Sequence, residues 1–562
     1  MFSLLWIIFL LLSSSRASVI RDFQVAQPPV VPADTKSCTV EIISHDFANS
    51  FADGPAITQL NPPQDCGSVG SWAAITLNLT VTTNGTQFDR LGIFTFHNAE
   101  IWRTSTFEPT IGDGIIWTYI KDVTQYMPLF SQPGEFLLEL DNLIETGLDG
   151  VYFTIVTATY YESSTDHPPA KKADMIIPLS TLSNTTGDDA SVPPAFSLNV
   201  TVPKNTVAIY AELFASGNGL EEDWFLNVPD EFFPDISSNI TSSHDGFREV
   251  RLLIDGLVAG VAFPYITVFS GVGVTPAFNR AATVLQVLVI IALVQLMSLS
   301  RSVAELPTYF VDVSPFIPLL TDGSPHNFTL DVVSAETNHT INSNWFVSGI
   351  LQVILDNSSE PTTGRMTVHS ASDYANTSIT GFATDFGHFD ATVTATRDIH
   401  IEADIRSGSD QLTHIVWKQD LRFTNIQTYR NNGLLATLTQ TSYGNSSSTH
   451  NGVAVLSDIF SYPFSTNFDY LDETLTNWTS SIDHSYDRVL LPNPLRIVST
   501  INGFFQLGSD KSGNFGNGTN NNTFSYSDAE GNTYTRRVNA INSNFNDTIT
   551  IPLDEVGGNL DH

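Results

Sequence analysis

Cysteine is nearly absent from this chain of 562 residues, which contains only Cys38 and Cys66. Two cysteines are too few for a disulfide-rich scaffold, and without other ligands they cannot form a structural zinc site. The Cys-x-x-Cys spacing of redox motifs is missing too. Packed apolar cores must therefore supply most of the stability.

Basic residues are also scarce. Lys and Arg total 24 against 59 Asp and Glu, which gives a formal net charge of -35. A phosphate backbone or an anionic membrane surface would be repelled by this charge. Nucleic acid is therefore not expected as a partner.

Several common catalytic motifs are missing from the sequence. It has no Gly-x-Ser-x-Gly elbow, no His-Glu-x-x-His zinc helix, no phosphate-binding Gly-rich loop and no EF-hand spacing. His388 and Asp390, and likewise His400 and Glu402, are spaced like metal ligands, but strand alternation places such residues on one polar face anyway. We expect neither a metal nor an organic cofactor.

Apolar and aromatic residues are plentiful and follow a strand pattern. The hydrophobic fraction is 42%, with 37 Phe, 16 Tyr and 8 Trp. Apolar residues alternate with polar ones in 150–161, 391–404 and 533–551, and Asp255-Gly256 is a hairpin-turn dipeptide. The pattern predicts an all-β protein of sandwiches or jelly rolls.

The length predicts about three or four units. Linker-like segments at 163–172 and 340–343 divide the chain into a first unit at 36–165, a second at 170–340 and a C-terminal β domain at 345–562. The Asn- and Gly-rich stretch 508–522 predicts a long exposed loop.

The N-terminus indicates export. An apolar run at 4–12, followed by Ser15-Arg16-Ala17, predicts a cleaved signal peptide over residues 1–17. Fourteen Asn-x-Ser/Thr sites agree with a secreted or vacuolar location. In an oxidising compartment we expect Cys38 and Cys66 to pair, the alternative being two buried thiols.

Residues 281–300 carry no charge and are long enough for a transmembrane helix. Glycosylation sites lie on both sides of this run, five before it and nine after it. A single span would leave many of them on the unglycosylated face. We therefore favour a buried insertion or a sequence-assignment artefact over a membrane span, and we expect a monomer.

Aromatic, acidic and Arg residues concentrate in the first two units, which is the composition that sugar recognition needs. Trp rings stack on apolar sugar faces, while carboxylates and Arg forks hydrogen-bond to hydroxyls. Each such residue alone is more simply a core aromatic or a solvated charge. The candidate sugar contacts are Arg90, Trp102, Arg103, Glu108, Trp117, Glu221 and Trp224.

Several stretches of the first 345 residues resemble the acidic peptide N-glycanase A family of fungi and plants. They are residues 48–51, 62–66, 88–93, 103–110, 117–124, 221–222, 248–260, 306–309 and 318–323. The resemblance implies an amidase that cleaves the Asn side-chain amide of N-glycopeptides or glycoproteins. It resumes after 281–300, which supports reading that run as an insertion.

The family is distantly similar to a bacterial peptide N-glycosidase built from two jelly rolls, with the active site at their interface. This similarity implies two jelly-roll-like sandwiches here, with Asp89 as the principal catalytic carboxylate and Glu222 as its partner. Asp141 or Asn142 falls near the position of a third acid. Arg90 and Trp72 or Trp102 would be contacts by proximity.

Two departures from the family pattern lie beside Glu222. Leu220 stands where the family has Cys, and Asp223 stands where it has an aromatic residue. Neither removes a catalytic carboxylate. Two other functions remain open, a non-catalytic glycan-binding protein on the same scaffold and a glycosidase that cuts between sugars.

Overall fold

The computed structural model describes residues 20–21, 31–32, 34–107, 114–268, 306–471, 477–491, 495–510, 513–528, 533–541 and 544–550. The predicted signal peptide and the apolar run 281–300 lie outside these residues. Within the described ranges, every helix is too short or too polar to cross a membrane.

The first unit is a sandwich of two sheets, with strand orders β1-β7-β4-β9-β2 and β3-β8-β5-β6. Along β4, Leu77, Leu79 and Val81 are buried while Asn78 between them faces the other side, as the alternation predicts. The elements are β1 (Ile20–Arg21), β2 (Ser37–Phe47), α1 (Ser50–Asp53), β3 (Ala56–Leu60), β4 (Trp72–Thr83), β5 (Leu91–Phe96), β6 (Ala99–Ser105), β7 (Ile115–Asp122), η1 (Thr124–Tyr126), α2 (Met127–Phe130), β8 (Gly134–Leu140) and β9 (Tyr152–Glu162).

The second unit is also a sandwich. One sheet has the order β10-β18-β13-β16, with β11 paired to β18, and the other has the order β12-β17-β14-β15. The elements are β10 (Met175–Leu179), β11 (Ala190–Val192), β12 (Phe196–Val200), β13 (Thr206–Asn218), η2 (Gly219–Glu221), η3 (Trp224–Leu226), η4 (Phe233–Asp235), β14 (Glu249–Ile254), β15 (Leu257–Ala262), β16 (Tyr309–Asp312), η5 (Ser314–Phe316), α6 (Ile317–Leu320), β17 (His326–Val333) and β18 (Asn344–Leu355).

Two sequence predictions meet different outcomes in this sandwich. The predicted hairpin turn is confirmed, because Asp255 and Gly256 join β14 to β15 with φ angles of 48° and 82°. Strand β18, which we expected to open the third unit, instead pairs with β13 along its whole length. Alternation predicts a strand but does not say which sheet the strand joins.

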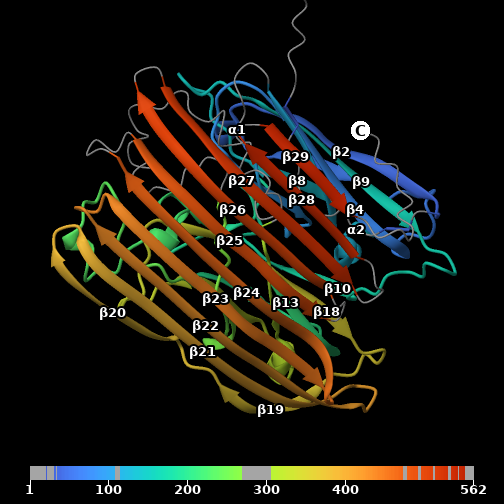
Figure 1. Ribbon diagram of the computed structural model, residues 1–562. Helices are drawn as coiled ribbons and strands as arrows, with labels where there is room; N and C mark the ends of the chain where they lie inside the picture. Colours follow the sequence, from blue (N-terminus) through green and yellow to red (C-terminus); the bar gives the residue numbers. More distant parts are fainter. Residues whose placement is uncertain are drawn as a thin grey trace, which may run out of the picture.

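The remaining strands form one long antiparallel sheet, drawn from yellow to red in Figure 1. The predicted loop at 508–522 is wrong, because 508–510 lie in β26 and 513–522 lie in β27, and these two strands pair with each other. The strands are β19 (Thr363–Ser370), β20 (Asn376–Asp385), β21 (His388–Arg406), β22 (Leu412–Arg430), β23 (Leu435–His450), β24 (Val453–Tyr470), β25 (Asn477–Leu491), β26 (Leu495–Asp510), β27 (Gly513–Asp528), β28 (Thr533–Ile541) and β29 (Asn544–Thr550). The all-β prediction is confirmed.

The C-terminal sheet and the second sandwich share one apolar core. Buried residues from β13, β14 and β15 belong to the same cluster as buried residues from β21, β22 and β24. Polar contacts cross the interface too, such as the bond from Trp417 Nε1 to Ala259 O at 3.0 Å. The first sandwich has a separate core.

Cys38 and Cys66 form the predicted disulfide, with their Cα atoms 5.8 Å apart. The bond ties the start of β2 to the segment that precedes β4. Closing a loop of this length lowers the entropy of the unfolded chain and contributes about 3 to 4 kcal/mol of stability.

Candidate active site

Asp89 lies on the first sandwich, in the segment that joins β4 to β5. The residue after it is fixed to the chain just past β6, because Arg90 N donates to Thr106 Oγ1 at 2.7 Å and Thr106 N donates to Arg90 O at 2.8 Å. Gln87 is buried and donates to Leu143 O at 2.9 Å. The half-buried Asp89 carboxylate is therefore carried by a well-anchored segment.

Glu222 lies on the second sandwich, in the tight turn between β13 and η3. The turn begins at Gly219, whose φ of 60° favours glycine. Gly219 N donates to Glu222 Oε1 at 3.2 Å, so the turn fixes its own carboxylate. The Glu222 side chain is half-buried.

The two acids interact although they come from different sandwiches. Burial, together with the charge of Asp89 and then that of Asp223, raises the pKa of Glu222 to about 8. Burial and the same Asp89 charge raise the pKa of Asp223 to about 7. Like charges have this effect only when they lie close together. Asp89 and Glu222 therefore share one electrostatic environment at the contact of the two sandwiches.

Arg90 supplies positive charge to this group of acids. Its cation opposes the rise in the Glu222 pKa, and it likewise opposes the partial desolvation that raises the pKa of Asp141. The guanidinium donates from Nη2 to Gln87 Oε1 at 2.7 Å, while its Nε has no hydrogen-bond partner among the residues that the structure describes. Arg90 is thus the cation of this group of acids.

Of the two alternatives for the third acid, Asp141 fits the site better than Asn142. Asp141 is exposed and senses Arg90. Asn142 is fully buried, and its Nδ2 donates to Phe47 O at 2.9 Å and to Gly150 O at 3.0 Å. Asn142 therefore holds the first sandwich together.

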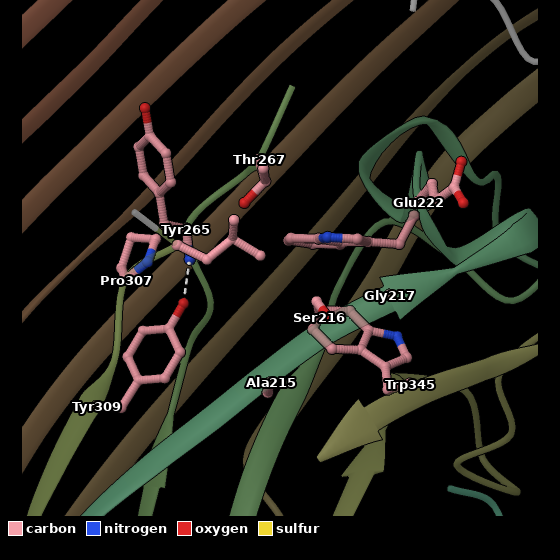
Figure 2. A pocket seen from close by; sticks show the side chains of 11 residues that line it. Ala215, Ser216, Gly217, Glu222, Tyr265, Thr267, Pro307, Tyr309 and Trp345 are labelled. Carbon is pink, nitrogen blue, oxygen red and sulfur yellow. Dashed lines mark hydrogen bonds between the residues drawn. The ribbon is translucent and has the colours of Figure 1, made fainter. Parts of the chain in front are cut away.

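A small pocket lies beside Glu222. In Figure 2, Glu222 is on one side and Tyr265, Tyr309 and Pro307 are on the other. Tyr265 N donates to Tyr309 Oη at 3.0 Å, which fixes that wall. The full lining is Ala215, Ser216, Gly217, Glu222, Trp224, Tyr265, Thr267, Leu306, Pro307, Tyr309 and Trp345. Aromatic walls with a carboxylate at one side suit an amphipathic ligand such as a sugar.

Glu221, the neighbour of Glu222, points into the protein. It is fully buried and paired through both carboxylate oxygens with Arg248, at 2.5 Å to Nε and 2.7 Å to Nη2. Trp345 Nε1 and Asn342 N also donate to it, at 2.8 and 2.9 Å. Although burial opposes the change, these donors hold its pKa below the usual value. Glu221 anchors the turn, and the expected sugar contact is not supported.

A sequence model described as Peptide N-acetyl-beta-D-glucosaminyl asparaginase amidase A matches residues 28–372. The chain belongs to this family. A second model, the PNGase A C-terminal domain, matches residues 390–464. The first match includes both sandwiches and therefore both Asp89 and Glu222. The family prediction from the sequence is confirmed.

A relative identified by sequence comparison carries the name of the same family. The peptide-N4-(N-acetyl-beta-glucosaminyl)asparagine amidase A of Prunus dulcis is 29% identical over 374 residues, which cover 62% of this chain and 59% of the relative. The chain thus matches about three fifths of that relative's length. A solved structure titled "Structure of PNGF-II in C2 space group" has a TM-score of 0.37 and 11% identity, over 57% of this chain and 66% of that one.

Other residues predicted to contact sugar lie elsewhere. Trp102 is fully buried and stacks on Phe94 with ring centres 4.6 Å apart. Trp117 is buried against Phe107. Both are core residues of the first sandwich, which corrects the prediction. Trp224 does line the pocket, and Glu108 lies outside the described residues.

Arg103 joins the two sandwiches instead of meeting a ligand. It is buried and pairs with Glu100 through Nε and Nη2, at 2.7 and 2.8 Å. Its Nη1 crosses to the second sandwich, donating to Ser216 Oγ at 2.9 Å and to Phe346 O at 2.6 Å. The guanidinium therefore fixes how the sandwich carrying Asp89 sits against the one carrying Glu222.

Sequence reasoning gave no role to several residues of the site. Arg248 lies in the stretch 248–260 that resembles the family, but the sequence of that stretch does not indicate an ion pair with Glu221. Trp345, Tyr265 and Tyr309 are aromatic residues in strand-like segments, and such residues usually belong to a core. Among the described residues, no group of three His, Cys, Asp or Glu side chains is arranged to hold a metal ion.

The buried acids predict that the protein is more stable at acidic than at alkaline pH. The folded pKa values of Glu222, Asp223 and Asp245 are raised to about 8, 7 and 8. Because they exceed the unfolded values of about 4, these groups stabilise the fold fully below about pH 4, and that stability is lost as the pH rises through about 8. Thermal unfolding between pH 5 and pH 9 should show a falling Tm.

A matched variant isolates one of these acids. Asp223→Asn removes a carboxyl that must ionise inside the protein at high pH, so its Tm should fall less steeply than that of the wild type. Asp46→Asn, at an exposed position of β2, is the control and should leave the slope unchanged. A wild-type Tm that rises with pH over this range would contradict the assignment.

Proposed function

We propose that this chain is a peptide N-glycanase that hydrolyses the amide between N-acetylglucosamine and an Asn side chain. Water adds to the amide carbon, the carbon–nitrogen bond breaks, the glycan leaves as a glycosylamine and Asn becomes Asp. The electrostatic contact between Asp89 and Glu222 across the two sandwiches is the observation that carries the proposal. Membership of the amidase A family supports it.

The two acids suit different steps. Asp89 acts as the general base that removes a proton from the attacking water, a role worth about 10² to 10⁴ in rate. Glu222, whose pKa is raised to about 8, keeps its proton at acidic and neutral pH. It can therefore donate that proton toward the departing nitrogen, which would otherwise be a poor leaving group. Two carboxyls with different environments divide base and acid roles in this way.

Arg90 and the pocket complete the proposed arrangement. As water adds, the amide oxygen gains negative charge, and a guanidinium directed at it lowers the barrier. The Arg90 guanidinium, whose charge acts on Glu222, supplies this positive charge. Trp224 and Trp345, whose ring centres are 6.2 Å apart, are buried in the wall of the pocket beside Glu222.

We also propose that the protein follows the secretory pathway, to the exterior or a vacuole. The disulfide between Cys38 and Cys66 and the exposed Asn199 and Asn445 glycosylation sites support this. Expression in a eukaryotic host and treatment with an independent deglycosylating enzyme tests it. A mass unchanged by that treatment would argue against this route.

The test of the activity is incubation of the full chain with an N-glycopeptide at acidic pH, followed by mass spectrometry. Release of the whole glycan, with aspartate in place of asparagine in the peptide, is the expected result. A sugar left on Asn would indicate a glycosidase that cuts between sugars. Binding of the glycopeptide without any release would favour the non-catalytic glycan-binding function.

A further inference from the structure

The turn that carries Glu222 is held by side chains from the C-terminal sheet. Directly after it, in η3, Asn425 Nδ2 donates to Phe225 O at 3.0 Å. Gln427 Nε2 donates to Asn227 O at 2.8 Å. Both donors come from β22, about 200 residues further along the chain, so the contact joins two parts of the molecule that the sequence separates widely.

These donors form a small network within the sheet. Gln427 Nε2 also donates to Asn425 Oδ1 at 3.0 Å, and Asn425 Nδ2 donates to Gln440 Oε1 of β23 at 2.8 Å. All three side chains are almost completely buried. Buried amides that bond to one another are held in one orientation, because losing any bond leaves a polar group unsatisfied.

The surrounding packing brings the sheet close to the turn. A Cβ added at Gly246 would lie 2.5 Å from Asn425 Nδ2 and 3.0 Å from Phe225 O, so glycine is needed for this approach. The Phe225 ring packs on Phe464 of β24 with centres 5.0 Å apart. Leu226 O, which lies between Phe225 O and Asn227 O, accepts a hydrogen bond from Thr241 Oγ1 at 2.7 Å. Three successive carbonyls directly after the turn, at 225–227, are thus fixed by side chains.

The same sheet also supports the opposite wall of the pocket. Tyr265 stacks on His484 of β25, with ring centres 4.5 Å apart and an angle of 12° between the planes. Burial lowers the pKa of His484 to about 3, so the ring is neutral. Tyr265 therefore rests on an uncharged aromatic surface supplied by the C-terminal sheet.

We infer that the C-terminal sheet is part of the catalytic unit and that Asn425 and Gln427 are positioning residues for Glu222. They act through the backbone carbonyls of Phe225 and Asn227, directly after the turn, and do not touch the substrate. This inference rests on the proposed function, since it concerns the proton donor of that reaction. A displacement of about 1 Å in such a group can cost about 10²-fold in rate.

Two variants test the inference. Gln427→Met and Asn425→Leu keep the approximate volume and remove the donor, so kcat on a glycopeptide should fall by about 10- to 100-fold with little change in KM. The upper limb of the pH profile of kcat/KM should move as well, because a loosened turn changes the distance of Glu222 from Asp89. Gln427→Asn, whose amide is too short for Asn227 O, carries the same expectation if either variant fails to fold.

Gln419→Met is the matched control. Gln419 lies on the same strand and the same face, is equally buried, and bonds both ways with the backbone of Val261 in β15 at 2.9 Å. Its loss should lower the unfolding midpoint about as much, while kcat and the pH profile stay as in the wild type. The inference is overturned if Gln427→Met and Asn425→Leu keep wild-type kcat and pH profile, or if Gln419→Met loses kcat to the same extent.

A readout without activity separates this inference from the proposed function. Hydrogen exchange of the backbone amides at 222–228 should be faster in Gln427→Met than in Gln419→Met. If the wild type releases no glycan but this difference is present, the proposed reaction is wrong, while the role of Asn425 and Gln427 in holding the segment after the turn still stands. If the wild type is active and the exchange rates are equal, Gln427 does not hold the segment after the turn and the inference is wrong.

Discussion

Asp89→Asn should lower glycan release by about 10² to 10⁴, because an amide cannot accept the proton that the attacking water must lose. The substitution keeps the shape of the side chain. It also removes the charge that raises the pKa values of Glu222 and Asp223, so the folded protein should be no less stable at neutral pH. Initial rates with a glycopeptide, together with the Tm, give both results.

The control for this experiment is Asp122→Asn, at an exposed position in the same sandwich. It makes a comparable charge change away from the site and should leave both rate and Tm close to wild type. If Asp89→Asn released glycan at more than about a tenth of the wild-type rate, Asp89 would not be the general base.

Arg248→Met should destabilise the fold by about 3 to 5 kcal/mol, because it leaves the Glu221 carboxylate buried without its partner. The guanidinium also donates to three backbone carbonyls, those of His244, Asp245 and Phe247, at 2.9, 3.1 and 2.6 Å. All of these acceptors would lose a donor at once. Denaturant unfolding, compared through its midpoint and slope, measures the loss.

A double variant shows how much of that loss comes from the isolated charge. Adding Glu221→Gln to Arg248→Met removes the buried carboxylate and should recover part of the stability. Arg365→Met is the control, because Arg365 is 79% exposed and 3.9 Å from Asp404, and it should change stability by less than about 1 kcal/mol. A loss below about 1 kcal/mol for Arg248→Met would show that the pair does not anchor the turn.

The strand pattern predicted the fold class because alternation reflects burial of one sheet face, as in β4 and β21. It could not assign β18, since an apolar strand fits either neighbouring sheet. It also failed at 508–522, where Asn and Gly residues that favour turns lie in paired strands. There, pairing with the adjacent strands outweighs local preference.

Within the site, the sequence could not show which neighbours support each acid. Glu221 and Glu222 are adjacent and chemically alike, and only the turn geometry sends one inward to Arg248 and the other toward Asp89. Composition indicated sugar-binding aromatic residues but placed Trp102 and Trp117 wrongly, because counts do not say which rings a core needs. The place of Trp345 beside Glu221 and in the pocket lining can be seen only in the folded structure.

The core shared by the second sandwich and the C-terminal sheet limits how the chain can be shortened. A truncation after Leu355 would leave Phe225, Val261 and their buried neighbours facing water. Large exposed apolar patches promote aggregation. Expression of the two sandwiches by themselves should therefore yield insoluble material, and crystallisation or engineering efforts need to retain the whole C-terminal sheet.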